Sequence, residues 1–148
     1  MRHPSAGFTL LEVLVSIIIL SIGLLGMAGM MALGMKSNHI ASYRSQATFL
    51  ADDILDRMRA NKTLALASQY DKALGGGCPA AVSTIQGYDC NEWKTMVAND
   101  LPAGQASVSI DLNGNVTIVI QWQSGLDENN DGTVDASDVL NFTTTTRL

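Results

Sequence analysis

The stretch that decides the organisation of this chain reads Gly7-Phe8-Thr9-Leu10-Leu11-Glu12-Val13-Leu14-Val15. It opens a segment, residues 8–35, in which 20 of 28 residues are apolar and Glu12 carries the only charge. The last 23 of these residues, 13–35, are all uncharged. A helix of that length, rising about 1.5 Å per residue, spans a bilayer core of about 30 Å. The sequence therefore predicts one membrane-spanning helix.

The rest of the chain has the composition of one globular domain. Of 148 residues in total, residues 36–148 make up 113, of which about 42% are apolar. This excludes a disordered chain, a collagen-like repeat, a multi-span transporter and a cysteine-dense mini-protein. The net charge is −5, and residues 100–148 hold seven acidic groups against Arg147. An acidic surface does not attract phosphate backbones, so we expect no direct nucleic-acid binding.

The apolar segment differs from an ordinary secretory signal peptide. Its apolar run is longer than the usual 7–15 residues, and no A-x-A-like cleavage site follows it at Met35-Lys36-Ser37-Asn38. Glu12 is unusual in such a segment, because a carboxylate in a membrane helix is energetically expensive. Either it lies hydrated near the headgroups, or it pairs with an ammonium group at a helix N-terminus.

Residues 7–15 resemble the signature of type IV prepilins and of their secretion-system relatives, the pseudopilins. The resemblance implies that a prepilin peptidase cuts after Gly7 and methylates the new amine of Phe8. It also implies that Glu12 pairs with the N-terminal amine of a neighbouring subunit during filament assembly. Many pilins have a helix-breaking proline in the apolar run, whereas this chain has glycines, which permit either local melting or close helix packing. They are Gly23, Gly26, Gly29 and Gly34.

The resemblance implies a domain organisation and a location. Residues 1–7 are expected to be a cleaved leader, residues 8–35 the membrane and assembly half of a long helix, and residues 36–148 a periplasmic or extracellular pilin domain. The expected partners are other minor and major pilins, met through the N-terminal helix, the prepilin peptidase and an inner-membrane assembly platform. The protein would lie in the inner membrane of a Gram-negative type bacterium before it enters a surface filament.

Beyond Met35, apolar residues recur with a helical period and form one amphipathic face. They are Tyr43, Ala47, Leu50, Ala51, Ile54, Leu55 and Met58. One helix is predicted from near Phe8 to about Ala65. Its charged face includes Asp53 and Arg57, spaced i,i+4 with the acid first, which is favourable. That face is either solvated or a lateral contact between subunits.

The chain has two cysteines, Cys78 and Cys90. In an exported domain they indicate one disulfide, because neither a C-x-x-C redox spacing nor a second pair of zinc ligands is present. The sequence from Asp89 to Glu92 has the Asp-x-x-Glu form of an N-terminal cap. Trp93, Met96, Val97 and Leu101 then indicate a short amphipathic helix that ends before Pro102.

Two alternating runs, 107–112 and 116–123, predict strands joined at Asn113-Gly114-Asn115. A three-residue loop gives one continuous apolar face and is the predicted register, with Asn115 in the left-handed conformation. It pairs Leu112 with Val116, Ile110 with Ile118 and Val108 with Ile120. A third strand is predicted at residues 139–146. The fold class is therefore α+β: a long N-terminal helix packed on a C-terminal antiparallel sheet, as in the pilin fold.

Residues 127–138 have the spacing of a twelve-residue calcium loop. Gly132 occupies the sharp turn, and oxygen ligands are expected from Asp127, Asn129, Asp131, the Thr133 carbonyl, Asp135 and Asp138. Calcium would order the loop; the alternative is a solvated acidic loop.

Later motifs resemble the PilV-type minor pilins. They are Ala51-Asp52-Asp53-Ile54-Leu55-Asp56-Arg57-Met58-Arg59-Ala60-Asn61, Cys90-Asn91-Glu92-Trp93 and Leu101-Pro102-Ala103-Gly104. The resemblance implies a non-catalytic minor pilin near the tip of a type IV pilus, where it supports assembly, adhesion, twitching or DNA uptake. The alternative is a minor pseudopilin of type II secretion. An enzyme is not expected, because after cleavage only His39 remains as a histidine and both cysteines are expected to be bonded.

Overall fold

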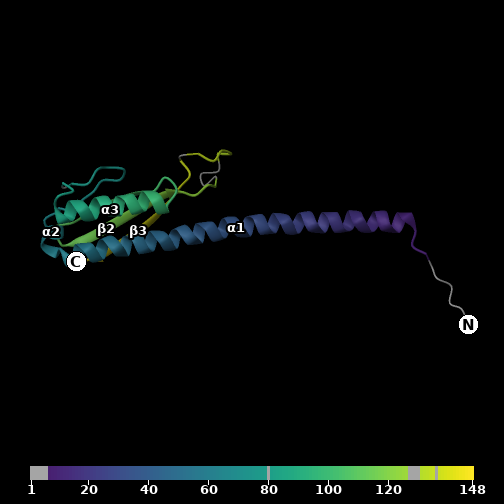
Figure 1. Ribbon diagram of the computed structural model, residues 1–148, viewed down its shortest axis with the longest axis horizontal. Helices are drawn as coiled ribbons and strands as arrows, with labels where there is room; N and C mark the ends of the chain where they lie inside the picture. The colour runs from purple at the N-terminus through teal and green to yellow at the C-terminus, as the bar shows by residue number, and fades with distance from the viewer. Residues whose placement is uncertain (1–6, 80, 127–130, 136) are drawn as a thin grey trace, which may run out of the picture. The chain divides into compact units, whose positions relative to one another are not determined.

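The computed structural model describes residues 7–79, 81–126, 131–135 and 137–148. Helix α1, Leu10–Ala60, contains the apolar segment and the amphipathic segment (Figure 1). The predicted single helix to about Ala65 is interrupted, because Asn61 leaves the helical conformation with φ −121° and ψ 42°. A short helix α2, Lys62–Leu66, follows. The chain divides between His39 and Ile40 into two units.

In the first unit, α1 is long and apolar enough to cross a membrane by length and composition, and its apolar window is entirely unburied. The side chains at 10–35 are exposed around the whole helix, which is the pattern of a helix that needs lipid or other helices as its surroundings.

In the second unit, α1 contributes one face to the core of the domain. The buried residues on that face are Ala47, Leu50, Ala51, Ile54, Leu55 and Met58, and Tyr43 is half-buried against them. The predicted amphipathic face is therefore confirmed. Its partner surface comes from the sheet and from helix α3, Ile85–Asp100.

Helix α3 begins at Ile85, before the cap predicted at Asp89. Its N-cap is Thr84, whose hydroxyl oxygen accepts the backbone N–H of Gly87 at 3.2 Å. The predicted cap at Asp89 is wrong, since Asp89 is a buried residue inside the helix. The predicted end of the helix before Pro102 is confirmed, because the C-cap is Leu101. Trp93 fixes α3 to α1 by donating from Nε1 to the Leu50 carbonyl oxygen at 2.7 Å.

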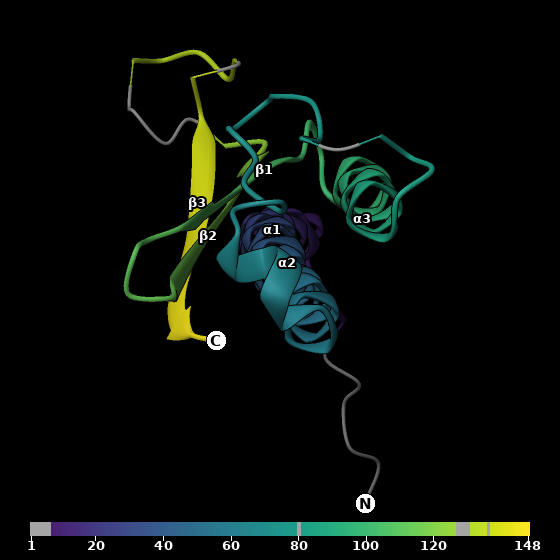
Figure 2. The same cartoon turned by 90° about the vertical axis from the view of Figure 1, so that its left-hand side faces the viewer.

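The sheet has three antiparallel strands in the order β1-β2-β3 (Figure 2). They are β1, Gln105–Ile110, β2, Asn115–Gln123, and β3, Val139–Arg147. The third strand is where the sequence predicted it. The α+β fold class, with a long N-terminal helix and a C-terminal antiparallel sheet, is confirmed.

The predicted hairpin register is wrong by two residues. Ile110 pairs with Val116, Val108 with Ile118 and Ala106 with Ile120, so that Leu112 lies in the turn and is fully exposed. The turn is organised by the Asp111 carboxylate, which accepts the backbone N–H groups of Asn113 and Asn115, each at 2.8 Å. The left-handed residue is Gly114, with φ +78°, and not Asn115.

Candidate functional site

The bond between Gly7 and Phe8 lies just outside the first turn of α1. Residues 7–9 are not helical, and the Phe8 side chain is 83% exposed. Thr9 caps the helix, because its backbone oxygen and its hydroxyl both accept the N–H of Glu12, at 3.1 and 3.3 Å. The bond predicted to be cut therefore lies outside the helix and is accessible, as a peptidase requires.

Glu12 lies in the first turn of α1. It lines one shallow hollow together with Phe8, Val13, Ser16, Ile17 and Leu20. A negative charge at this end of a helix is favourable, because unpaired N–H groups give that end a partial positive charge. The carboxylate and the residue that would carry the new amine are thus on the same stretch of surface, surrounded by apolar side chains.

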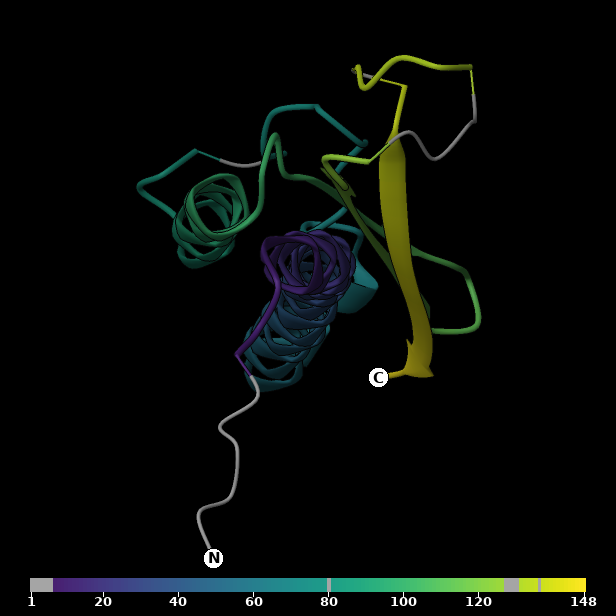
Figure 3. The ribbon, with the colours of Figure 1, turned by 90° about the vertical axis from the view of Figure 1, so that its right-hand side faces the viewer.

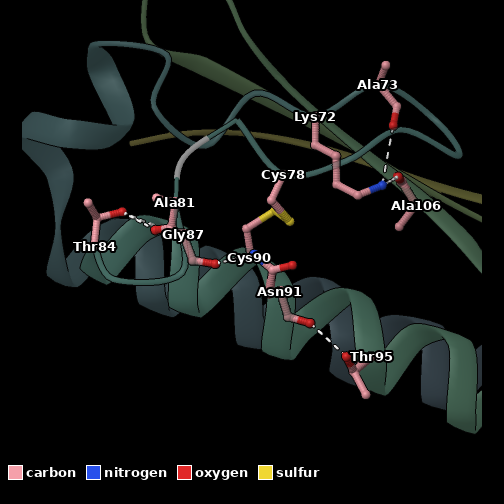
Figure 4. Close-up of a disulfide and its surroundings, with 10 residues drawn as sticks. All are labelled: Lys72, Ala73, Cys78, Ala81, Thr84, Gly87, Cys90, Asn91, Thr95 and Ala106. Carbon is pink, nitrogen blue, oxygen red and sulfur yellow. Dashed lines mark hydrogen bonds between the residues drawn. A yellow bond between two sulfur atoms is a disulfide. The ribbon is translucent and has the colours of Figure 1, made fainter.

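A disulfide joins Cys78 to Cys90, with a distance of 5.8 Å between the Cα atoms. Figure 4 shows that it ties the segment before α3 to the helix itself. The same segment pairs with the edge of β1, because Lys72 exchanges two backbone hydrogen bonds with Val108, at 2.8 and 2.9 Å. The predicted disulfide is therefore present, and it anchors a segment that covers one edge of the sheet.

The predicted calcium loop is described only in part, since Asp127 and Asn129 lie outside the described residues. The Asp131 carboxylate accepts the backbone N–H of Thr133 at 2.9 Å, and the Asp135 carboxylate accepts that of Ser137 at 2.7 Å. The bond from the Ser137 N–H lowers the pKa of Asp135. Asp138 is 1% exposed, and its carboxylate accepts the backbone N–H of Asp135 at 2.8 Å. In the described ranges, no group of three or more acidic, histidine or cysteine side chains is arranged to hold a metal.

Arg57 has more charged partners than its i,i+4 spacing from Asp53 predicted. The predicted pair with Asp53 is present, at 2.9 Å. Arg57 also reaches across to α3, where it lies 2.6 Å from Glu92 and 3.4 Å from Asp89. This face of α1 is thus partly occupied by an intramolecular contact that local spacing does not reveal.

Comparison with known families gives one match. Residues 2–28 match the model of the prokaryotic N-terminal methylation motif. No curated protein and no solved structure is matched by the chain. The matched range includes Gly7, Phe8 and Glu12, so the N-terminal segment carries the signal typical of type IV pilin-like and pseudopilin-like prepilins.

Proposed function

We propose that the chain is a minor pilin of a type IV pilus, most similar to the PilV type, and that it acts as a non-catalytic filament component. The observation that carries this proposal is the methylation motif at residues 2–28, followed by a long apolar helix whose second half packs on an antiparallel sheet. The mature chain would begin at Phe8, after removal of residues 1–7. Residues 8–35 would anchor it in the inner membrane, and residues 36–148 would lie outside.

Glu12 has the central role in this proposal. Once the helix leaves lipid for a filament core, an unpaired carboxylate is costly and a paired one is tolerable. Its partner would be the methylated amine of Phe8 on a neighbouring subunit. The accessible Gly7–Phe8 bond and the hollow shared by Phe8 and Glu12 are compatible with this pairing.

The experiment compares the wild-type chain with Glu12→Gln in the source bacterium. Mass spectrometry is expected to find an N-methylated Phe8 in both proteins, because the cleavage site is intact. Sheared surface filaments are expected to contain the wild type and to lack Glu12→Gln. The control is Asp52→Asn, an exposed acid in the second unit, which should enter filaments. A chain that retains Met1, or Glu12→Gln found in filaments at the wild-type level, would contradict the proposal.

The second candidate is a minor pseudopilin of a type II secretion system, which has the same processing signal. Deletion of the gene distinguishes the two functions in one strain. Loss of surface pili with normal secretion of exoenzymes supports the minor pilin, with its roles in assembly near the tip, adhesion, twitching or DNA uptake. Loss of secreted exoenzymes with normal pili supports the pseudopilin.

We also propose that residues 127–138 bind a structural calcium ion through Asp127, Asn129, Asp131, Thr133, Asp135 and Asp138. The support is the twelve-residue spacing and the turn at Gly132, which has φ +90° at the position where calcium loops need glycine. Isothermal titration of the mature chain in detergent micelles should give heat with Ca²⁺. Asp131→Ala should remove it, and Asp100→Ala, outside the loop, should not. Absence of heat in the wild type, or an unchanged signal in Asp131→Ala, would contradict this site.

A further inference from the structure

Strand β3 forms an open edge of the sheet. It is the last strand in the order β1-β2-β3, and all nine of its residues pair with β2 without a bulge. Figures 2 and 3 show β3 at the side of the sheet away from α3. The opposite edge, along β1, is different, because Lys72 pairs with it and the disulfide holds that segment in place.

The backbone groups on this open edge can be identified from two hydrogen bonds that flank the strand. The N–H of Leu148 donates to the Gly114 carbonyl, and the N–H of Ser124 donates to the Asp138 carbonyl, each at 3.1 Å. Hydrogen-bonded pairs alternate along an antiparallel ladder, so the even-numbered residues of β3 face β2. Asn141, Thr143 and Thr145 therefore direct their N–H and C=O groups away from the sheet, and in the described part of the chain these groups have no hydrogen-bond partner.

Apart from Arg147 at its end, the edge lacks the features that normally prevent pairing with another strand. Residues 139–146 contain no charge and no proline, and the ladder has no bulge. Long, regular, uncharged edges are sites of strand addition, and natural domains usually interrupt or cover them. The side chains of Asn141, Thr143 and Thr145 are exposed, and those of Leu140 and Phe142 on the other face are half-buried. A strand added here would bury both rows.

We propose that β3 pairs antiparallel with β3 of a second copy of this chain. The strand is complementary to itself in a register centred on Thr143. In that register Thr143 lies opposite Thr143 of the second copy, Thr145 lies opposite Asn141, and Arg147 lies opposite Val139. No like charges meet, and threonine pairs across strands are favourable. The result is one continuous six-stranded sheet across the two copies.

The contact has a two-fold axis. Antiparallel extension places the axis perpendicular to the sheet, so any direction along the sheet is reversed in the second copy. Residues 40–60 of α1, which pack on the sheet, would run in opposite directions in the two copies. The contact uses the sheet of the second unit and needs neither the cleavage at Gly7 nor Glu12, so it can fail while the proposed function holds.

The test uses the mature full-length chain in detergent micelles, with its self-association followed by light scattering. The wild type is expected to form dimers. Thr143→Lys and Thr143→Asp should each remain monomeric, because position 143 faces itself and like charges would meet. Mixing the two variants should restore the dimer. Ser109→Lys, an exposed position on β1 away from the open edge, should dimerise like the wild type.

Cross-linking gives an independent readout of the register. Thr143→Cys should form a disulfide-linked dimer under mild oxidation, and Ser109→Cys should not. The proposal is overturned if the wild type is monomeric or if either charged variant dimerises alone. It is also overturned if the mixture of the two variants stays monomeric, or if Thr143→Cys cross-links only to a different protein in cells.

Discussion

The hydroxyl of Tyr70 donates a 2.7 Å hydrogen bond to the carboxylate of Asp89, and both residues are buried. Tyr70 lies in the segment between α2 and α3, Asp89 lies on α3, and Arg57 of α1 approaches the other carboxylate oxygen at 3.4 Å. Three parts of the second unit thus meet at one acid. Because a buried carboxylate is costly without partners, this contact specifies how α3 docks on α1.

Tyr70→Phe is expected to destabilise the domain by about 1–3 kcal/mol, because Asp89 keeps its burial and loses its best donor. The measurement is thermal unfolding of the mature chain in detergent micelles, followed by the fluorescence of Trp93 and Trp122, which are both buried. The matched control is Tyr88→Phe on the exposed side of α3, which should leave stability unchanged. Equal melting temperatures for the two variants would contradict the role assigned to Tyr70.

The same pair predicts how stability changes at high pH. Burial, and then the hydrogen bond and negative charge of Asp89, raise the pKa of the Tyr70 hydroxyl well above its usual value of 10.0. A group whose pKa is raised on folding contributes its full stability below the unfolded pKa and loses it above. Above about pH 10 the wild type should therefore lose stability more steeply than Tyr70→Phe. Parallel curves for the two proteins would show that Tyr70 does not cause the loss.

Replacing both Cys78 and Cys90 by serine should lower stability by about 3 kcal/mol or less, as expected for a loop of this length. The variant loses the tie between α3 and the segment that covers the edge of β1. Adding a reductant to the wild type should reproduce the shift in melting temperature, and adding it to the double variant should have no effect. A wild-type melting temperature that is insensitive to reduction would contradict this prediction.

The sequence predicts the elements that depend on local pattern better than those that depend on distant partners. The apolar run, the buried face of α1 and the position of β3 follow from composition and periodicity. The start of α3 does not, because its first turn is fixed by a threonine cap before an irregular apolar pattern. The contacts of Arg57 with Asp89 and Glu92, 32 and 35 residues away, have no local signature at all.

The hairpin between β1 and β2 shows why its strand register was predicted wrongly. Matching apolar faces favoured a register that included Leu112, whereas the polar side chain of Asp111 closes the turn earlier and places Leu112 outside. The chemistry of one turn residue outweighed the burial of one leucine. The N-terminal motif could be identified from the sequence, because Gly7, Phe8 and Glu12 lie close together in the chain and their spacing needs no tertiary information.

The observed register of the β1–β2 hairpin can be tested by substitution of Leu112. Leu112→Ala should change stability by less than about 0.5 kcal/mol, because the side chain is fully exposed in the turn. Val116→Ala, at a buried position on the neighbouring strand, should be clearly destabilising because it leaves a cavity. Asp111→Ala should also destabilise, since three N–H donors lose their acceptor. A loss of about 2–5 kcal/mol in Leu112→Ala would instead support the register in which Leu112 belongs to the core.

The burial of Lys72 predicts a rise in stability with pH, opposite to the loss that Tyr70 causes. It is 5% exposed, and its Nζ donates to the carbonyl oxygens of Ala106 and Ala73, at 2.7 and 3.3 Å (Figure 4). In the described ranges none of the salt bridges includes it. Burial, and then the positive charge of Lys94, lower its pKa from the usual 10.5.

Because the unfolded chain binds the Lys72 proton more tightly than the folded chain, stability should rise with pH as the unfolded pKa of 10.5 is approached. Between pH 7 and about pH 9, where Tyr70 is almost entirely protonated in both states, Lys72→Met should flatten this rise. Lys94→Met should reduce the rise in part, since it removes the second cause of the lowered pKa. Lys62→Met, an exposed lysine, should keep the wild-type slope. If Lys72→Met keeps it as well, the buried ammonium is not the titrating group.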